Sequence, residues 1–291
     1  MKKLRRTMLF VPANNPNMIM NAPVFKPDCI IFDLEDAISL KEKDSARDLL
    51  VEALKTFEYC NCEIFARVNP LYTPFGKDDV RELVKAGLRN VRLPMSETDE
   101  DIKNLDVLLT EIEKDLGIDR GTVKILGAIE TAKGVINAEK IAVASSRMLG
   151  ISFGAEDFTR TIGSERSREG EELFVARCKI VLAAAAAGID AIDTVYADIE
   201  DEEGFEREAQ SARKLGFAGK SVIHPRQIGV VHSIFTPSKE EVYRALRVIS
   251  AIQEAEAKGL GVIALDGKMI DGPIVDKAER IVTLAKGAGL L

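Results

Sequence analysis

Acidic side chains follow two apolar runs near the middle of this 291-residue chain. The run Lys124–Ile129 leads directly to Glu130, and the run Met148–Phe153 is followed by Glu156 and Asp157. A carboxylate is costly to bury without a partner, so acids at the ends of buried runs need an explanation. Mg²⁺ commonly takes one or two carboxylates and completes its octahedral shell with water and substrate oxygens. We therefore predict that Glu130 and Asp157 bind a magnesium ion; the alternative is that both acids cap the helices that follow.

Glu156 and Asp157 are neighbours, and neighbouring side chains on an extended strand point to opposite faces. We therefore assign only Asp157 to the metal and leave Glu156 with a supporting role or a hydrogen bond to the loop.

A basic side chain lies within a third apolar run. Arg67 stands between Ala66 and Val68, and a guanidinium in such surroundings needs a partner, for which a planar carboxylate is well suited. That partner is either a substrate carboxylate or one of the acids that the fold brings close.

The segment FDLEDA places three acids after a fourth apolar run. Because side chains alternate along a strand, Asp33 and Glu35 are expected to face one way and Asp36 the other. Only part of this cluster can therefore face the site. Hydrogen bonding to the loop backbone is the alternative role for Asp33 and Glu35.

The elements that would position these residues alternate regularly. Several of the helix-like segments end at glycine, which is a common helix stop signal. Eight strand–helix units in a chain of this length predict a (β/α)₈ TIM barrel, in which polar residues at the strand ends converge on one rim. A doubly wound open sheet shares the alternation, but the count of eight favours the barrel. The predicted strands are Thr7–Val11, Cys29–Leu34, Glu63–Val68, Val91–Leu93, Lys124–Ile129, Met148–Phe153, Ala191–Val195 and Ser221–His224.

The domain boundary is predicted near residue 235. Residues 1–235 would form the catalytic barrel, and residues 236–291 a C-terminal helical extension that begins with an amphipathic helix, Lys239–Lys258. A closed barrel does not need this extension, so we expect it to pack on the barrel or on a neighbouring subunit.

The composition argues against several classes of protein. The formal net charge of −7 and the absence of a long basic cluster argue against nucleic-acid binding. No run approaches the about 20 apolar residues of a membrane helix, and the start MKKLRR is not followed by a secretory h-region. Four cysteines and two histidines show no zinc-type spacing, which indicates reduced thiols in a cytoplasmic protein.

Other catalytic classes lack their residues. The segment KLGFAGKS resembles the end of a P-loop but lacks its first glycine and precedes a strand. No predicted strand ends in lysine, since Lys220 lies at a strand start, and this weakens an imine-forming aldolase. There is no GxSxG elbow, and His224 has no positioned nucleophile beside it.

Six motifs follow one another in a specific order: LFVPANNP, FDLEDA, FARVNP, GAIETAKG, SFGAEDF and LDGKMIDGP. In this order they resemble the citrate lyase beta subunits and, more broadly, the lyases of the HpcH/HpaI aldolase and malyl-CoA lyase group. The resemblance covers essentially the whole chain. It implies a TIM barrel that binds Mg²⁺ through Glu130 and Asp157 and holds a substrate carboxylate with Arg67.

The resemblance also implies roles for two further acids. Asp36 matches an acid that supports the metal waters. Asp271, within KMIDGP, resembles a tail aspartate that relatives insert into a neighbouring subunit's site, which implies a homo-oligomer, either a trimer or a hexamer. Either acid is a candidate for the proton transfers.

The implied reaction is the retro-Claisen cleavage of a citryl thioester to oxaloacetate and an acetyl thioester, with substrate contacts from Arg67 and through Glu130. Relatives that use CoA have a glycine and basic residues after LFVP, whereas here Ala13 follows and no basic residue precedes Lys26. This favours a thioester on an acyl-carrier protein subunit, beside other citrate lyase subunits, and the basic start (Lys2, Lys3, Arg5 and Arg6) would suit an acidic carrier. The alternatives are a lyase for malyl-CoA or citramalyl-CoA and a non-catalytic carrier-protein scaffold.

Overall fold

The computed structural model describes residues 3–59, 61–256, 263–265 and 268–291. Cys60 and part of the LDGKMIDGP motif thus lie outside the described residues. The chain divides into two compact units, Arg5–Val231 and a second unit of Met1–Leu4 with His232–Leu291. No helix within the described ranges is long and apolar enough to cross a membrane.

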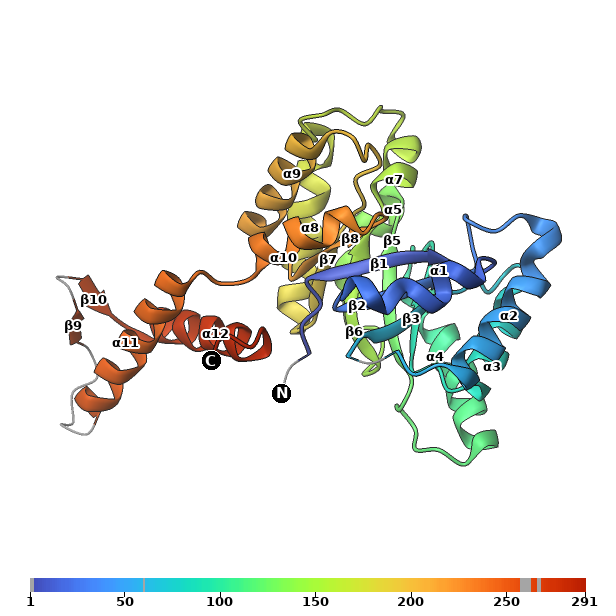
Figure 1. The fold of residues 1–291 in the computed structure, drawn as a ribbon, viewed down its shortest axis with the longest axis horizontal. Coiled ribbons are helices and arrows are strands. Elements are labelled where there is room, and N and C mark those ends of the chain that lie inside the picture. Colours follow the sequence, from blue (N-terminus) through green and yellow to red (C-terminus); the bar gives the residue numbers. More distant parts are fainter. Residues whose placement is uncertain (1–2, 60, 257–262, 266–267) are drawn as a thin grey trace. The chain divides into compact units, whose positions relative to one another are not determined.

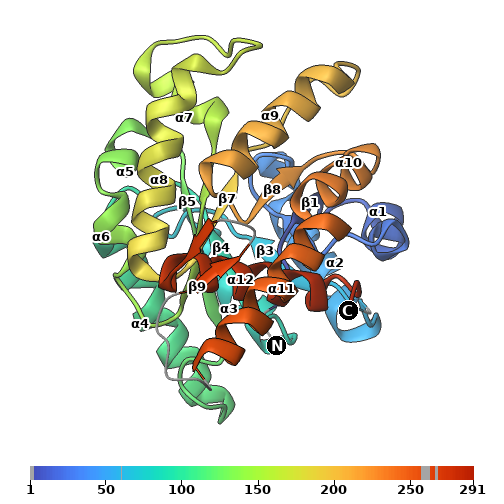
Figure 2. The ribbon, with the colours of Figure 1, turned by 90° about the vertical axis from the view of Figure 1, so that its left-hand side faces the viewer.

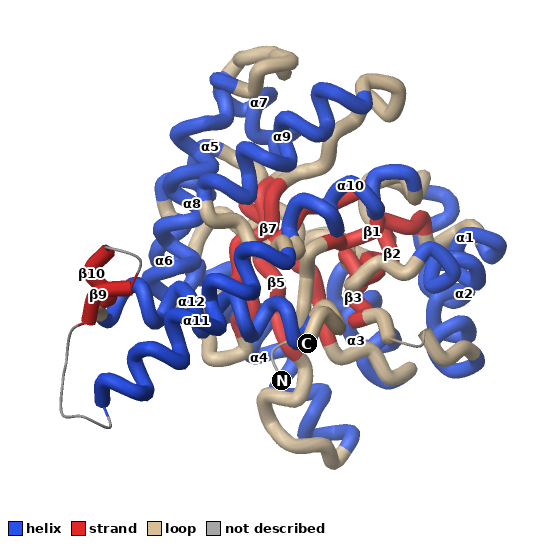
Figure 3. Tube along the Cα trace, turned by 60° about the vertical axis from the view of Figure 1, so that its left-hand side comes forward, coloured by secondary structure: helices blue, strands red, loops and turns tan. Residues whose placement is uncertain are grey.

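The larger unit is built on eight parallel strands that close into a barrel in the order in which they occur along the chain (Figure 1). In Figure 3 the barrel strands, drawn in red, lie inside a surround of helices. The predicted (β/α)₈ TIM barrel is therefore confirmed. The strands are β1 (Thr7–Pro12), β2 (Cys29–Asp33), β3 (Glu63–Arg67), β4 (Asn90–Leu93), β5 (Lys124–Ile129), β6 (Met148–Phe153), β7 (Asp190–Asp193) and β8 (Gly219–Val222).

Helices connect each strand to the next, and α8 and α9 pack against β7 and β8 (Figures 1 and 2). The helices are α1 (Pro16–Asn21), α2 (Lys43–Thr56), α3 (Gly76–Lys85), α4 (Asp99–Leu116), α5 (Ala132–Ile136), α6 (Ala138–Ala142), α7 (Ala155–Ile162), α8 (Phe174–Ala187), α9 (Glu202–Leu215) and α10 (Arg226–Phe235), with short 3₁₀ turns η1 (Ala22–Phe25), η2 (Leu40–Glu42) and η3 (Glu171–Leu173).

The interior of the barrel is filled by apolar side chains of alternate strand positions. The central cluster consists of Met8, Cys29, Ile31, Phe65, Leu126 and Ile192. The parallel register pairs Ile31 with Phe65 and, two positions further along the same strands, Asp33 with Arg67. Because residues two apart share a face, Asp33 and Arg67 continue the inward rows at the carboxyl ends of β2 and β3.

Several ion networks stabilise the unit away from that rim. At the amino ends of the strands, Arg5 pairs with Glu63 and Asp190 at 2.6 and 2.8 Å. Behind β7 and β8, the Lys220 ammonium lies 2.9 Å from Asp193 and 2.7 Å from Glu208. Arg177 on α8 contacts the same two carboxylates, and Arg166 adds a third cation 3.1 Å from Glu208.

Two helices differ from the sequence expectation. The sequence pattern of Val135–Ala144 predicts a single helix, but the structure has two, α5 and α6, which divide at Asn137. The side-chain amide of Asn137 donates to the Glu97 carbonyl oxygen at 3.0 Å. Directly after Phe153, the chain turns at Gly154 into α7, so Glu156 and Asp157 lie in the first turn of a helix and not on an extended segment.

The smaller unit contains α11 (Lys239–Glu256), an antiparallel pair β9 (Ile263–Leu265) and β10 (Lys268–Ile270), and α12 (Gly272–Gly287). Its core consists of Ala245, Val248, Ile270, Ala278 and Val282. The predicted boundary at residue 235, and the packing of the extension on the barrel or on a neighbouring subunit, stay predictions.

Candidate functional site

A cavity of about 430 Å³ opens at the carboxyl ends of the barrel strands. It is lined by side chains from separate strands and from the loops that follow them, among them Phe10, Asp33, Asp36, Arg67, Arg92, Glu130, Asp157 and Ser221. Four of the five predicted site residues (Arg67, Glu130, Asp157 and Asp36) therefore come together in one cavity.

Arg67 is held by all three acids of FDLEDA. Its Nε and Nη2 donate to the two oxygens of Asp33, both at 2.7 Å, and its Nη1 lies 2.9 Å from Glu35 and 3.0 Å from Asp36. Asp33 also accepts hydrogen bonds from the backbone N–H groups of Glu35 and Ala37. The expectation that one of these acids binds the loop backbone is confirmed for Asp33, and the carboxylate partner of Arg67 is present within the chain.

The three acids differ in their protonation. Burial alone would raise the pKa of Asp33, but the hydrogen bonds and charge of Arg67 outweigh it and leave that pKa below its ordinary value. Burial raises the pKa of Glu35 to about 8, with the charge of Arg67 opposing the shift and those of Glu130 and Asp36 adding to it. The Glu35 Oε2 atom is buried and accepts no aligned hydrogen bond despite its closeness to Arg67. Glu35 is thus a carboxyl group that keeps its proton near neutral pH.

Glu130 directly follows β5 and points into the cavity. Its Oε2 accepts a hydrogen bond from the Met95 backbone N–H at 2.9 Å, and its Oε1 lies 3.3 Å from Arg92 Nη2. Gly154 makes room for it, since a Cβ at position 154 would lie 2.4 Å from Glu130 Cγ. Met95 has a φ of 49°, a left-handed backbone conformation that is uncommon for a residue with a side chain. Such strained positions cluster at functional sites.

Asp157 lies in the first turn of α7 and is paired with Arg160 at 2.5 Å. The neighbouring Glu156 is more exposed and lies 3.2 Å from Arg166. The two acids therefore have separate partners, and the geometry of the helix, not strand alternation, directs them apart.

The residues present fit a magnesium ion. In the part of the chain that the structure describes, no group of three or more His, Cys, Asp or Glu side chains is arranged to hold a metal alone. Mg²⁺ does not need one, because two carboxylates with water and substrate complete its shell. Glu130 and Asp157 line the same cavity, and Gly154 leaves the room that the Glu130 side chain occupies there.

Sequence reasoning missed two polar residues of this cavity. Arg92 is almost fully buried on β4, and Ser221 is buried on β8. The signal for Arg92 was available, because it stands between Val91 and Leu93 as Arg67 stands between Ala66 and Val68. Ser221 follows Lys220 and carries no pattern of its own.

Other predicted residues lie elsewhere. Asp271 belongs to the smaller unit, where it is the N-cap of α12 and its Oδ1 accepts the Ile274 N–H at 3.4 Å. Arg5 is committed to the ion network at the amino ends of the strands, and Arg6 pairs with Asp28 at 2.7 Å. These two arginines are therefore not available to a carrier protein, contrary to the sequence expectation.

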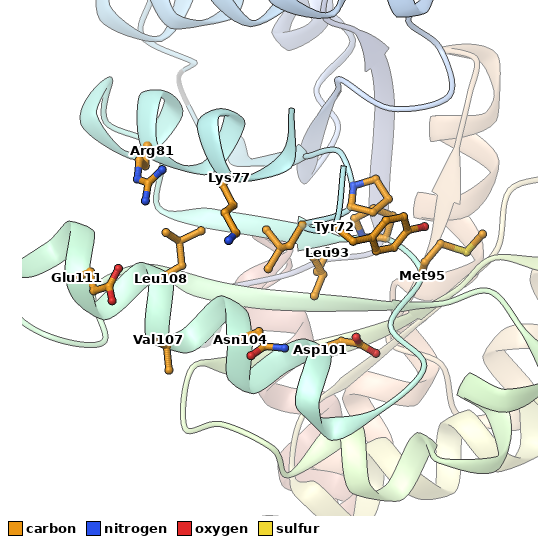
Figure 4. A pocket seen from close by; sticks show the side chains of 13 residues that line it. Tyr72, Lys77, Arg81, Leu93, Met95, Asp101, Asn104, Val107, Leu108 and Glu111 are labelled. Carbon is orange, nitrogen blue, oxygen red and sulfur yellow. The ribbon is translucent and has the colours of Figure 1, made fainter. Parts of the chain in front are cut away.

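A second cavity of about 500 Å³ lies between α3 and α4. Figure 4 shows Lys77 and Arg81 projecting from α3, Glu111 on α4, and Tyr72 with Met95 at one end. Its charges are spread along the groove and do not converge on a point. The first cavity is therefore the candidate site, and Met95 lies beside both cavities.

The sequence matches one family model over most of the larger unit. The model described as HpcH/HpaI aldolase/citrate lyase matches residues 6–225. The chain belongs to this family. The citrate lyase subunit beta of Haemophilus influenzae is 50% identical over 284 residues, which cover 98% of each chain. The family resemblance stated from the six motifs is thereby confirmed.

Solved structures of the HpcH/HpaI aldolase/citrate lyase family share the fold. The protein CitE of Mycobacterium tuberculosis, in complex with magnesium, acetoacetate and coenzyme A, aligns with a TM-score of 0.77 and 30% identity, covering 97% of this chain and 98% of that one. A citrate lyase beta subunit from the same organism, complexed with oxaloacetate and magnesium, aligns with a TM-score of 0.68 and 31% identity, covering 80% of this chain and 98% of that one.

Proposed function

We propose that this chain is the beta subunit of a citrate lyase, a Mg²⁺-dependent carbon–carbon lyase that cleaves a citryl thioester to oxaloacetate and an acetyl thioester. The observation that carries the proposal is the convergence of Glu130, Asp157 and Arg67 on one cavity in a chain 50% identical to a citrate lyase subunit beta. The magnesium and oxaloacetate bound by a related citrate lyase beta subunit support the same assignment.

The reaction needs a proton acceptor at one atom and a proton donor at another. The tertiary hydroxyl of the citryl group loses its proton, and its C–O bond becomes the C=O bond of a ketone. At the same time, the bond from this carbon to the thioester-bearing CH₂ breaks. The electron pair passes to that CH₂ as a thioester enolate, which gains a proton to become the acetyl group. A positioned carboxyl group is suited to both transfers.

The metal site is assigned to Glu130 and Asp157. A bound Mg²⁺ supplies Lewis-acid stabilisation of oxygen charge. Glu130 is oriented for this task by the Met95 N–H and by Arg92, and Asp157 by Arg160. Arg67 supplies positive charge for a substrate carboxylate or for the developing enolate.

Asp36 is the proposed carboxylate for proton transfer or for holding a water molecule. Its side chain is 67% exposed and is fixed by Arg67, so it reaches both solvent and the cavity. Its partner Arg67 also contacts Glu35, a buried carboxyl group that keeps its proton near neutral pH.

The decisive test replaces each metal ligand in the full chain. We expect Glu130→Gln and Asp157→Asn each to abolish Mg²⁺-dependent release of oxaloacetate from a citryl carrier protein, because each removes the charge of one metal ligand. Glu139→Gln, an exposed acid on α6, is the matched control and should keep full activity. Full activity in a folded Glu130→Gln or Asp157→Asn variant would refute the metal assignment.

The carrier, partner and compartment belong to the same proposal. We place the chain in the cytoplasm, in a homo-oligomer (a trimer or hexamer) with an acyl-carrier protein and the other citrate lyase subunits. Comparing citryl carrier protein with malyl-CoA and citramalyl-CoA as substrates separates this function from the related CoA lyases. A magnesium titration separates it from a non-catalytic scaffold, which would not bind the ion at this site.

A further inference from the structure

Arg92 is a second guanidinium at the base of the candidate site, and the proposed reaction so far uses it only to orient Glu130. On β4 it pairs in register with Leu126, a member of the inward core cluster. Its Nε donates to Ser152 Oγ at 3.2 Å, and its side chain is 3% exposed. Burying a charged group of this size is costly unless its donors are satisfied.

One of its donor atoms is not satisfied within the described residues. Arg92 Nη1 is buried and has no hydrogen-bond partner, and the same holds for Ser221 Oγ. Both residues line the cavity that also holds Glu130. Buried polar groups are almost always paired, so two unpaired ones in one cavity point to a ligand that pairs with them.

Arg67 and Arg92 differ in how far their charge is already neutralised. Both guanidiniums lie over the Phe10 ring, 5.2 and 5.0 Å from its centroid. Arg67 contacts three carboxyl groups, whereas among the described residues Arg92 pairs with one carboxylate, that of Glu130, at 3.3 Å. Of the two, Arg92 therefore keeps more of its charge and a free donor for an incoming anion.

The ligand chemistry that satisfies a cationic N–H donor and a hydroxyl is a carboxylate. A citryl thioester carries two: one on the carbon that bears the hydroxyl, and one on a separate carboxymethyl arm. The first can chelate a cation together with the hydroxyl oxygen. The second carboxylate, on the carboxymethyl arm, takes no part in this chelation, and malyl and citramalyl thioesters lack it.

We propose that Arg92, assisted by Ser221, binds the carboxylate of the carboxymethyl arm and so makes the site specific for a citryl group. This inference rests on the proposed function, whose substrate it specifies. Arg92 is a specificity-determining residue here, and its contact with Glu130 couples the bound arm to the proposed metal ligand.

The test measures binding, so it does not depend on turnover. Malate and lactate both carry a hydroxyl beside a carboxylate, and only malate has the carboxymethyl arm. In calorimetric titrations of the full chain with Mg²⁺ present, we expect the wild type to bind malate more tightly than lactate. Arg92→Met should weaken malate binding about tenfold or more, as expected when a hydrogen bond to a charged group is lost, and weaken lactate binding by a clearly smaller factor, because lactate loses only the contribution of Arg92 to the position of Glu130.

Three further variants make the result specific. Ser221→Ala should weaken malate binding by a smaller factor, without affecting lactate. Arg92→Lys keeps the charge and should retain an intermediate preference for malate, which keeps the test usable if Arg92→Met unfolds. Arg81→Met, in the second cavity between α3 and α4, is the matched control and should change neither the malate affinity nor the lactate affinity.

A purely structural role for Arg92 gives a different result. If Arg92 served only to hold Glu130, its replacement would weaken Mg²⁺, malate and lactate binding together, and that parallel loss would overturn the proposal. An unchanged malate preference in folded Arg92→Met would overturn it as well. Failure of the proposed function would appear separately, as absence of oxaloacetate release by a wild type that still prefers malate.

Discussion

Three acids separated by at most three positions share one arginine, yet they differ in what each can do. Asp33 is buried and ionised because Arg67 and two backbone N–H groups bind it. Glu35 keeps its proton because burial outweighs the charge of Arg67. Asp36 is largely exposed. Chemical role at this site is therefore set by burial and hydrogen bonding, and not by residue type.

The raised pKa of Glu35 makes the stability of the folded protein depend on pH. The pKa of Glu35 is raised from 4.5 to about 8 by folding, so the folded state binds a proton that the unfolded state releases. Its contribution to stability is fully present below pH 4.5 and is lost as the pH rises to about 8. Without Mg²⁺, the wild type should therefore lose more unfolding free energy than Glu35→Gln between about pH 5 and about pH 9.

Urea unfolding at both pH values measures this difference. Glu58→Gln, an exposed acid after α2, is the control and should follow the wild type. If the unfolding free energies of the wild type and of Glu35→Gln changed by the same amount between the two pH values, Glu35 would be ionised in the folded protein.

Part of the residue-scale site could be predicted from sequence, because a charge flanked by apolar residues identifies an inward position near a strand end. That criterion identified Arg67 and applies equally to Arg92, which was overlooked. The unpaired state of Arg92 Nη1 and the raised pKa of Glu35 could not be predicted. Both depend on which side chains the closed barrel brings within a few ångströms.

At the scale of elements, the eight strands were predictable because buried parallel strands appear as short apolar runs between helices. The directions in which side chains beyond a strand end point could not be predicted. β2 ends at Asp33, so the alternation expected for Glu35 and Asp36 does not apply, and Arg67 contacts both of them. The loop backbone, fixed by Asp33, decides their direction.

The network behind β7 and β8 gives an element-scale prediction. Lys220 is fully buried and contacts Asp193, Glu208 and the Thr194 carbonyl oxygen. Lys220→Met would leave two buried carboxylates with one cation fewer, and we expect a loss of about 3–5 kcal/mol in unfolding free energy. Urea denaturation measures it, and the exposed Lys214→Met should stay within about 0.5 kcal/mol of the wild type.

The Lys220→Met variant also distinguishes a structural role of Lys220 from a role in metal binding. Lys220 lies outside the barrel interior and is saturated by its partners, so at temperatures where Lys220→Met remains folded its Mg²⁺ affinity should match that of the wild type. A selective loss of magnesium binding with unchanged stability would contradict the structural assignment.

At the scale of the whole molecule, the predicted site residues are divided between two units. Arg67, Glu130, Asp157 and Asp36 belong to the unit Arg5–Val231, and Asp271 belongs to the other. The proposal that Asp271 completes the site of a neighbouring subunit is tested by mixing inactive variants. Asp271→Asn is suited to this, because asparagine caps a helix as well as aspartate does and α12 should stay intact.

Mixed oligomers of Asp271→Asn and Glu130→Gln should recover part of the activity, since some sites would combine an intact Glu130 with an intact Asp271 from the neighbour. Mixing Glu130→Gln with Asp157→Asn is the control, because both lesions fall in the same subunit's cavity and no site is restored by exchange. No recovery in the first mixture would place Asp271 outside the shared site.

The buried network around Lys220 has a consequence for how this sequence can diverge. Lys220, Arg177, Asp193 and Glu208 lie together in a buried place, with Arg166 at its edge beside Glu208, so losing one of these charges alone changes the net charge that is buried. Replacing one cation and one anion together with apolar side chains leaves that net charge unchanged and is often close to neutral. Lineages should therefore lose these residues in pairs, and an alignment of relatives would show Lys220 covarying with one of its two acids.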